Sequence, residues 1–253
     1  MARIDYEEVA RDYKEGRGLA ADGLGAWREA LEPRLRGLGL PLVDVGSGTG
    51  QFAPLLARWF GIEVVGVEPS EAMRAVAQAD APFTTGGVRY LAGDAGHVPL
   101  PDESCGAAWL STVIQHIPDL AAAAREIGRV VVPGAPVLIR SAFPGSIERI
   151  SLFRYFPEAA AVVQTFPTIE QVERDFGAAG FTLESVEAIP QQTSSTLAAT
   201  RDRVALRADT TLRGISDSAF AQGLARLDKE IAGTGGAEPV TDWLDLVVLR
   251  RSR

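Results

Sequence analysis

Three glycines at alternate positions follow a short apolar run near the start of the chain. The stretch LVDVGSGTGQFAPLL, residues 42–56, contains Asp44 and then Gly46, Gly48 and Gly50, and a helix-like segment begins directly after them. Because glycine has no Cβ, such a loop can turn tightly and let a ligand approach the backbone closely. A dinucleotide fingerprint has its last glycine three residues after the second, and the spacing here is different. The loop could therefore hold a pyrophosphate, a nucleoside or neither, and a dinucleotide is the weaker expectation.

Two carboxylates stand where they could recognise a nucleoside. Glu68 ends the second apolar run, 18 residues after Gly50, and a carboxylate there can accept hydrogen bonds from both hydroxyls of a ribose. Asp94 follows the third apolar run, where it could accept from the exocyclic amine of adenine while the N–H of Ala95 donates to a ring nitrogen. Both carboxylates, and Asp44 in the loop, have plainer alternatives. Asp44 could cap the loop amides, Glu68 could be a solvated strand end, and Asp94 could serve only the turn GDAG.

A regular alternation of β-like and helical segments would position these residues. We expect strands at residues 41–45, 63–67, 88–92, 105–111 and 135–143. Helices are expected between them at residues 52–60, 70–78 and 119–131. Ser70 is a plausible N-cap for the second helix, and Asp119 lies near the start of the third. Strands that alternate with helices imply βαβ units and a parallel sheet covered on both faces.

Four segments of the chain form a specific series. In order they are VDVGSGTGQF, VVGVEPSEAM, LAGDAGHVPLPDES and IQHIPDLAAAAREIGRVVVPGAPVLIRSAF. Together they resemble the consecutive motifs of class I S-adenosylmethionine-dependent methyltransferases, of the type-11 group that includes ubiquinone and menaquinone biosynthesis and many natural-product enzymes. The resemblance covers residues 40–143 well and the flanks loosely. It implies an α/β fold, a doubly wound Rossmann-like sheet of seven strands, mostly parallel with the last strand antiparallel.

The same resemblance implies S-adenosyl-L-methionine as the cofactor and assigns residues to it. Glu68 takes the ribose, and Asp94 with Ala95 takes the adenine. The other cofactor positions are Asp44, Gly46, Ser47 and Gly48 at the methionine end, Pro69 and Met73 beside the adenosine, Ser111 and Gln115 near the sulfonium, and Tyr13 and Arg17 in the N-terminal segment. Arg17 would pair with the methionine carboxylate and Tyr13 would help to roof the pocket. A surface charge at a helix end is the alternative for Arg17.

His116 is the candidate catalytic base. By the resemblance, it lies where the family lines the sulfonium and the substrate mouth. Methyl transfer from a sulfonium is an in-line displacement, which needs a base only when the nucleophile is a hydroxyl or a protonated amine. A structural histidine that donates to a backbone carbonyl is the alternative for His116, and His97 is expected to be an ordinary loop residue. No motif fixes a divalent metal, so we predict no metal requirement.

The alternation loosens beyond residue 143. We expect a helix at residues 167–181 closed by Gly180, a strand at 182–190, helices within 197–231 and a last strand at 242–251. Two further helices are expected before residue 41, at residues 6–15 and 25–35. The predicted organisation is an N-terminal helical cap over residues 1–40, the cofactor-binding core over 41–143, and the rest of the sheet over 144–253 in the same domain.

The substrate pocket should come from segments that the core does not need. Residues 143–166 are rich in Phe, Tyr and Ile, and an insertion as long as 197–231 is seldom an idle loop, so both predict a lid over the substrate. Core helices buried on the flank of the sheet are the alternative. An aromatic lining of Phe143, Phe153, Tyr155 and Phe156 is expected to suit an apolar or aromatic molecule. Arg140 and Arg154 are expected to meet an acidic group on it.

Composition sets the wider limits. The 253 residues carry a net charge of −8, which argues against nucleic-acid and acidic-membrane partners. A single cysteine, Cys105, excludes an internal disulfide and a cysteine-based zinc site, and two histidines argue against a His-rich metal centre. The N-terminus lacks a secretory signal and no apolar run could span a membrane, so we predict a cytoplasmic protein.

The favoured function is a methyltransferase that acts on an oxygen, nitrogen or carbon of a small molecule, natural products included. A protein that binds the same cofactor without transferring its methyl group, for a cyclisation, an elimination or sensing, would carry the same motifs. A nicotinamide oxidoreductase is disfavoured by the glycine spacing and by Asp94. The substrate and the oligomeric state stay open, with a homodimer among the options.

Overall fold

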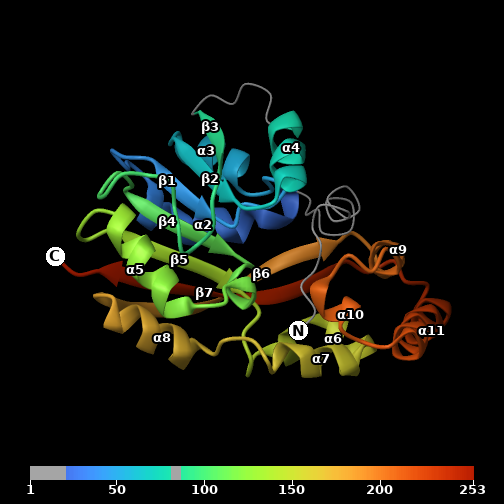
Figure 1. The fold of residues 1–253 in the computed structure, drawn as a ribbon. Coiled ribbons are helices and arrows are strands. Elements are labelled where there is room, and N and C mark those ends of the chain that lie inside the picture. The colour runs from blue at the N-terminus through green and yellow to red at the C-terminus, as the bar shows by residue number, and fades with distance from the viewer. Residues whose placement is uncertain (1–20, 81–86) are drawn as a thin grey trace. The chain divides into compact units, whose positions relative to one another are not determined.

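The computed structural model describes residues 21–80 and 87–253, and its central feature is one seven-stranded sheet (Figure 1). The strands lie in the order β3-β2-β1-β4-β5-β7-β6. Their bounds are β1 Leu42–Val45, β2 Val64–Glu68, β3 Val88–Ala92, β4 Ala107–Ser111, β5 Pro136–Ser141, β6 Phe181–Ser194 and β7 Val240–Arg251. Neighbouring strands among β1 to β5 are parallel, and β7 is antiparallel to β5. The predicted fold class is therefore confirmed.

Strands β1, β2 and β5 are buried along their whole length. Parallel strands covered on both faces need continuous apolar runs rather than alternating ones, which is the pattern of these segments. The chain continues from β1 to β2 on one side, whereas β4 lies on the other side of β1. The strand order therefore reverses between β1 and β4, and sheets of this kind bind their ligands at the carboxyl ends of the strands at that point.

Strand β6 is longer than the sequence predicts. The strand expected from the sequence spans residues 182–190. The observed strand continues to Ser194. Within the described residues, β6 is the last strand in the sheet order and has a strand partner on one side only. An edge position of this kind tolerates a proline.

The helices that follow β2 and β4 begin at caps visible in the sequence. At the start of α4, Glu71–Asp80, the Ser70 Oγ accepts a hydrogen bond of 3.2 Å from the N–H of Met73. At the start of α5, Leu120–Val130, the Asp119 Oδ1 accepts one of 2.9 Å from the N–H of Ala122. The N-cap predicted at Ser70 is confirmed, and Asp119, expected near the start of its helix, is the N-cap of α5. Three other helices are α2 Gly25–Leu35, α3 Ala53–Phe60 and α8 Ile169–Ala178.

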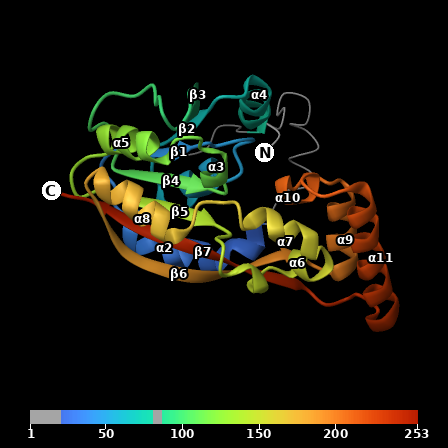
Figure 2. The same ribbon diagram turned by 60° about the horizontal axis from the view of Figure 1, so that its bottom comes forward.

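Figure 2 shows α5 and α8 side by side, and the two helices are in contact. The helix expected at residues 25–35 is confirmed as α2, and the one expected at residues 6–15 lies outside the described residues. Cys105 is buried, and burial raises the pKa of its thiol, so it is the unreactive core residue that the sequence predicts.

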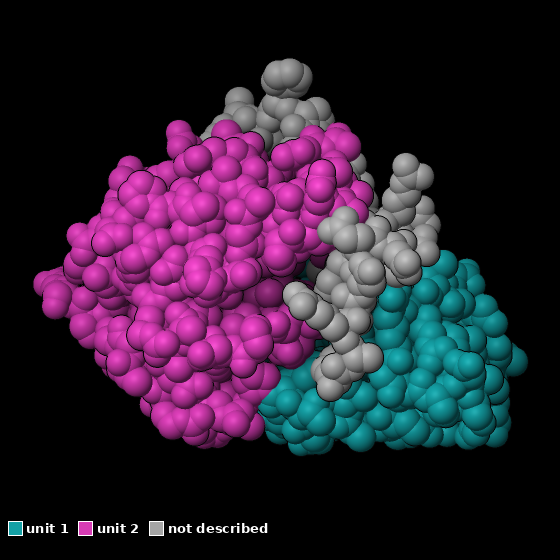
Figure 3. All heavy atoms as spheres, viewed as in Figure 1, with its two compact units in different colours: residues 1–27, 142–166, 189–244 teal, residues 28–141, 167–188, 245–253 magenta. Residues whose placement is uncertain are grey.

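The chain divides into two compact units, coloured separately in Figure 3. One unit comprises residues 28–141, 167–188 and 245–253, and contains the parallel strands. The other comprises residues 1–27, 142–166 and 189–244. We call the first the sheet unit and the second the helical unit.

The helical unit has a hydrophobic core of its own. Its elements after β5 are η3 Ile147–Arg149, α6 Ser151–Tyr155, α7 Pro157–Val163, α9 Leu197–Ala205, α10 Thr210–Arg213 and α11 Asp217–Thr234. The core combines residues of both segments that were expected to form the lid, namely Tyr155, Phe156, Ala159, Leu197, Val204, Leu212, Ile215, Leu227 and Val240. The insertion between β6 and β7 is thus helical as predicted, and its role as a lid stays a prediction.

Two glycines of α11 provide a test of this core. A Cβ on Gly223 would lie 2.0 Å from Cε1 of the buried Phe156, whereas a Cβ on Gly233 would meet no atom within 4 Å. We expect Gly223→Ala to lower the free energy of unfolding by about 1–3 kcal/mol, because overpacking outweighs the gain of up to about 1 kcal/mol in helix propensity.

Gly233→Ala is the matched control, and we expect it to leave stability unchanged or to raise it slightly, by up to about 1 kcal/mol. Urea denaturation followed by circular dichroism measures both variants. Equal stability of the two variants would contradict the packing of α11 on Phe156.

Candidate functional site

Polar side chains from four neighbouring strands share one face of the sheet at the carboxyl ends of these strands. In the register, Asp44 on β1 pairs with Gly66 on β2 and with Trp109 on β4. Ser111 on β4 pairs with Arg140 on β5. Because residues two apart on a strand point to the same face, four polar residues form one row. We call this row, which consists of Glu68, Asp44, Ser111 and Arg140, the polar row.

The glycine loop after β1 is fixed to the end of β2. The N–H groups of Gly46 and Ser47 both donate to the carbonyl of Val67, at 2.8 and 3.1 Å. Gly46, Gly48 and Gly50 have φ values of +70°, +54° and +75°, in the left-handed region that favours glycine. The loop conformation therefore depends on glycine at all three positions.

Only one of the three glycines faces open space. A Cβ on Gly46 would lie 2.3 Å from Cγ2 of Val113, and one on Gly50 would lie 2.3 Å from Oη of Tyr90. Among the described residues, a Cβ on Gly48 would meet no atom within 4 Å. Packing within the chain thus explains why Gly46 and Gly50 have no room for a side chain. Gly48 marks the place where a ligand could approach the loop backbone.

The Glu68 carboxylate bridges the glycine loop and the turn after β2. Its Oε2 accepts a hydrogen bond from the N–H of Gly48 and its Oε1 accepts one from the N–H of Ser70, each at 3.0 Å. Arg74 donates to the carbonyls of Glu68 and Pro69, at 2.7 and 2.8 Å, and so fixes the same turn. Backbone amides from both segments therefore hold the two oxygens of this carboxylate.

Asp44 is the most strongly perturbed carboxyl group of the site. Burial, and secondarily the negative charge of Glu68, raise the pKa of Asp44 from 3.8 to about 8. In the ligand-free protein at neutral pH, the carboxyl therefore holds a proton. A cation bound beside Asp44 would favour its ionised form, so this end of the polar row suits a positively charged ligand.

Two buried polar atoms near this end have no hydrogen-bond partner within the described part of the chain. They are Oγ of Ser47 in the glycine loop and Oε1 of Gln115. Gln115 belongs to η2, Ile114–His116, and its Nε2 donates to the carbonyl of Thr112 at 2.8 Å. Buried polar atoms normally have a partner, so a polar ligand is expected to complete them. The glycine loop, the acidic pair and these atoms fit S-adenosyl-L-methionine, whose methionine end carries polar and cationic groups.

Asp94 forms the turn after β3. Its Oδ1 accepts a hydrogen bond of 2.8 Å from the N–H of Gly96, and its backbone exchanges two hydrogen bonds with that of His97, at 3.3 and 3.2 Å. The side chain is 58% exposed. The turn function considered from the sequence is therefore present, and contact of Asp94 and Ala95 with adenine stays a prediction.

Arg140 is buried, with 4% of its surface exposed. Its Nη1 donates to Oγ of Ser111 at 3.1 Å, and its guanidinium carbon lies 5.0 Å from the ring centre of Phe52. Phe52 was not singled out from the sequence, although it follows the glycine loop directly. The role of Arg140 in binding a substrate stays a prediction.

His116 is exposed at the end of η2. Its backbone N–H donates to the carbonyl of Val113 at 2.8 Å. Met73 is buried and Pro69 is exposed at the turn after β2. Tyr13 and Arg17 lie outside the described residues.

The other expected substrate contacts belong to the helical unit. Phe143 and Tyr155 are buried, and Tyr155 belongs to the core of that unit. Arg154 is exposed and forms an ion pair of 3.1 Å with Glu230. These positions do not test the predicted contacts with a substrate.

Comparison with known proteins supports the interpretation of the sheet unit. Residues 43–139 match a family model described as a methyltransferase domain. A malonyl-[acyl-carrier protein] O-methyltransferase of Serratia marcescens is 30% identical over 152 residues, which is 58% of this chain and 57% of that protein. The chain thus spans less than two thirds of the length of this relative. A demethylmenaquinone methyltransferase of Thermus thermophilus is 29% identical over 205 residues, 70% of this chain and 91% of that protein.

Solved structures share the fold. The [4+2]-cyclase SpnF superposes with a TM-score of 0.62 at 22% identity, covering 98% of this chain and 93% of the cyclase. At this identity the likeness concerns the fold alone. In the described residues, no helix is both long and apolar enough to cross a membrane.

The buried Asp44 predicts a dependence of stability on pH. Between about pH 4 and pH 8 the native protein binds a proton that the unfolded chain has lost, so the free energy of unfolding falls as the pH rises. An asparagine side chain in its place cannot ionise. We therefore expect Asp44→Asn to gain stability relative to the unmodified protein as the pH rises, by at most about 1.4 kcal/mol per pH unit.

Urea denaturation of the ligand-free protein at several pH values between 5 and 8 measures this difference. Glu173→Gln removes the negative charge of an exposed residue of α8 and controls for net charge. A stability difference between Asp44→Asn and the unmodified protein that does not change with pH would show that Asp44 is already ionised.

Proposed function

Because the chain belongs to the class I S-adenosylmethionine-dependent methyltransferases, a family of enzymes whose cofactor is S-adenosyl-L-methionine, we propose that it transfers the methyl group of this cofactor to a small molecule. The observation that carries the proposal is the Glu68 bridge. A buried carboxylate at the end of β2 accepts from the open glycine loop and from the Ser70 N–H, so it is oriented toward the space beside Gly48.

Each part of the site then has a task in holding the cofactor. Glu68 accepts from the ribose hydroxyls, and Asp94 with the Ala95 N–H binds the adenine. The ionised form of Asp44 stabilises the positively charged methionine end. The other proposed contacts are Gly46, Ser47, Gly48, Pro69, Met73, Ser111 and Gln115, together with Tyr13 and Arg17 of the N-terminal segment.

When bound, S-adenosyl-L-methionine supplies a methyl group on a sulfonium, which needs no further activation. The residues of the chain mainly hold the acceptor in line with that methyl group. Alignment of two reactants can contribute up to about 7–11 kcal/mol of barrier reduction. Where the acceptor is a hydroxyl or a protonated amine, His116 accepts its proton.

The acceptor that we propose is a small molecule with an acidic group, methylated on oxygen, nitrogen or carbon. Arg140 supports the acidic group, because a guanidinium stays charged and lies in the polar row beside Ser111. The two relatives are named for different acceptors, malonyl-[acyl-carrier protein] and demethylmenaquinone, so they do not identify the acceptor of this chain. Arg154, Phe143 and Tyr155 are proposed as further substrate contacts from the aromatic segment 143–166.

A second candidate is a protein that uses the bound cofactor without transferring the methyl group. The fold likeness to a [4+2]-cyclase favours keeping this alternative. The residues that hold the cofactor would be the same in both cases. The two candidates differ in whether S-adenosylhomocysteine is formed.

Methyl transfer predicts that S-adenosylhomocysteine is released when the protein is incubated with methyl-labelled cofactor and a metabolite extract, and that the label enters an extract component. Glu68→Ala should abolish this turnover and weaken S-adenosylhomocysteine binding about 10- to 100-fold, because hydrogen bonds to a charged group contribute about 1.5–3 kcal/mol. Glu63→Ala, at an exposed residue just before β2, is the matched control and should bind as the unmodified protein does. Product formation without S-adenosylhomocysteine would favour the second candidate.

The assignment of His116 has a separate test. His116→Gln should lower kcat about 100-fold or more for a hydroxyl acceptor, because the amide cannot take up the proton. Its affinity for S-adenosylhomocysteine in calorimetry should stay unchanged, because His116 is exposed and no contact with the cofactor is proposed for it. An unchanged kcat would remove His116 from the mechanism.

A further inference from the structure

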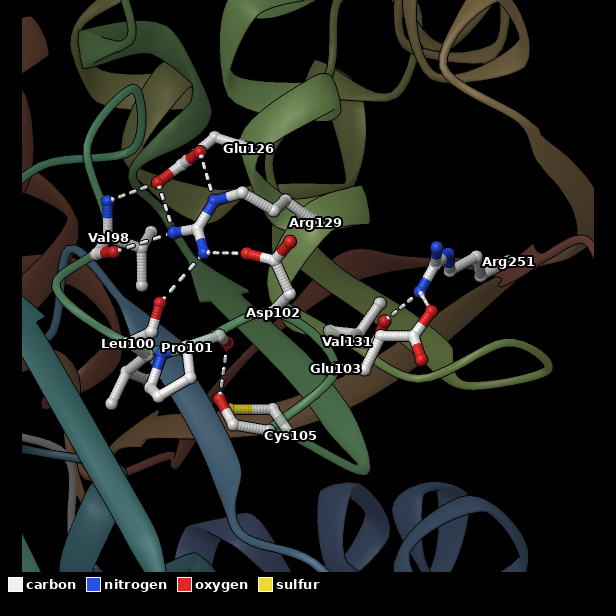
Figure 4. Close-up of polar contacts among 11 residues, drawn as sticks. Val98, Leu100, Pro101, Asp102, Glu103, Cys105, Glu126, Arg129, Val131 and Arg251 are labelled. Carbon is white, nitrogen blue, oxygen red and sulfur yellow. Dashed lines mark hydrogen bonds and ion pairs between the residues drawn. The ribbon is translucent and has the colours of Figure 1, made fainter.

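A side-chain cluster on α5 holds the loop between β3 and β4. The guanidinium of Arg129 donates to both carboxylate oxygens of Glu126, at 2.9 and 2.7 Å (Figure 4). It also donates to the carbonyls of Val98 and Leu100, at 3.0 and 2.9 Å, and to Oδ1 of Asp102 at 2.6 Å. Oε1 of Glu126 in turn accepts from the N–H of Val98 at 2.8 Å. We call Arg129 and Glu126 with these backbone partners the loop clamp.

The loop clamp binds both backbone groups of one residue. The Val98 N–H is held by Glu126 and the Val98 carbonyl by Arg129. Glu126 and Arg129 are mostly buried, with 18% and 33% of their side chains exposed, and charge-assisted hydrogen bonds in such positions are strong. Asp102 is 75% exposed, so its ion pair with Arg129 contributes little.

Val98 directly follows the turn that presents Asp94. His97 and Asp94 exchange two backbone hydrogen bonds, so a displacement of Val98 would be passed on to Asp94. Gly93 closes the turn tightly, because a Cβ there would lie 2.7 Å from Cδ of Pro99 and 2.9 Å from the carbonyl oxygen of His97. The Asp94 turn is thus fixed between β3 on one side and the loop clamp on the other.

We propose that Arg129 is a positioning residue for base recognition: through Val98 it holds Asp94 where the carboxylate distinguishes adenine from a purine without the 6-amino group. The inference rests on the proposed role of Asp94 in binding adenine. A hydrogen bond discriminates between ligands only when its acceptor is held in place, because its strength falls steeply with distance and angle. Arg129 itself contacts no part of the ligand.

A clamp that only stabilises the fold would behave differently. Its loss would lower the melting temperature and leave the ligand preference of the folded protein unchanged. The decisive quantity is therefore the ratio of the Kd values for two ligands, S-adenosylhomocysteine and its 6-deamino analogue, measured by calorimetry at a temperature where each variant is folded. The unmodified protein should prefer S-adenosylhomocysteine.

We expect Arg129→Met to lower this preference about 3-fold or more, and Arg129→Lys to retain part of it, since lysine keeps the charge and loses the fork of donors. Asp94→Ala should abolish the preference, and the double variant Arg129→Met with Asp94→Ala should lower it no further.

Arg250→Met is the matched control. Arg250 donates to both oxygens of Glu184, at 2.7 and 2.8 Å, and to the carbonyl of Gly134, and it has no contact with the loop clamp.

Arg250→Met should therefore lower the melting temperature without changing the ratio. If Arg129→Met does the same, the positioning role is wrong and the clamp is structural only. If Asp94→Ala keeps the full preference, the adenine assignment of the proposed function fails, and the inference fails with it. If Arg129→Met does not fold, Arg129→Lys and Glu126→Gln decide by the same ratio, and an unchanged ratio in both overturns the proposal.

Discussion

The hydrogen bonds from Gly48 and Ser70 to the Glu68 carboxylate are the constraint on which the rest of the site depends. They join the loop after β1 to the turn after β2, two segments 20 residues apart in the chain. Both oxygens are held by backbone amides, so the orientation of the carboxylate follows from the strand register. The left-handed glycines allow the loop to bring the Gly48 N–H to this carboxylate. The pairing of β1 with β2 therefore positions the glycine loop and Glu68 relative to each other.

This arrangement has a cost in electrostatics. Asp44 and Glu68 lie on the same face of neighbouring strands, and both are buried. Without a ligand, the protein reduces the repulsion by keeping a proton on Asp44, whose pKa of about 8 results from burial first and from Glu68 second. A fold optimised for stability alone would place apolar residues here. Buried acidic groups whose pKa is strongly shifted are typical of functional sites.

The sequence predicts the elements of the sheet well because the signals are local. Apolar runs mark β1 to β5, and Ser70 and Asp119 cap α4 and α5 as their positions in the sequence suggest. Only the end of β6 differs clearly, because whether Pro190 ends a strand depends on whether that strand lies at the sheet edge.

The properties of the site residues were less predictable than their positions. The proton on Asp44, the stacking of Arg140 on Phe52 and the loop clamp around Arg129 each depend on residues far away in the sequence. The spacing of Glu126 and Arg129, one helical turn apart, indicates an ion pair, but nothing local shows that it would hold Val98. Tertiary contacts supply this information.

The charges along the polar row suggest how the cofactor and the acceptor share the site. Two acidic groups, Glu68 and Asp44, stand on β2 and β1, and the positively charged Arg140 stands on β5, with Ser111 of β4 between them. We expect a cationic cofactor at the acidic end and an acceptor with a negative group at the basic end. The aromatic residues of segment 143–166 carry less weight for the choice of acceptor, because Tyr155 and Phe156 are already explained by the core of the helical unit. The chemical class of the acceptor is therefore better argued from Arg140 than from the aromatic composition of that segment.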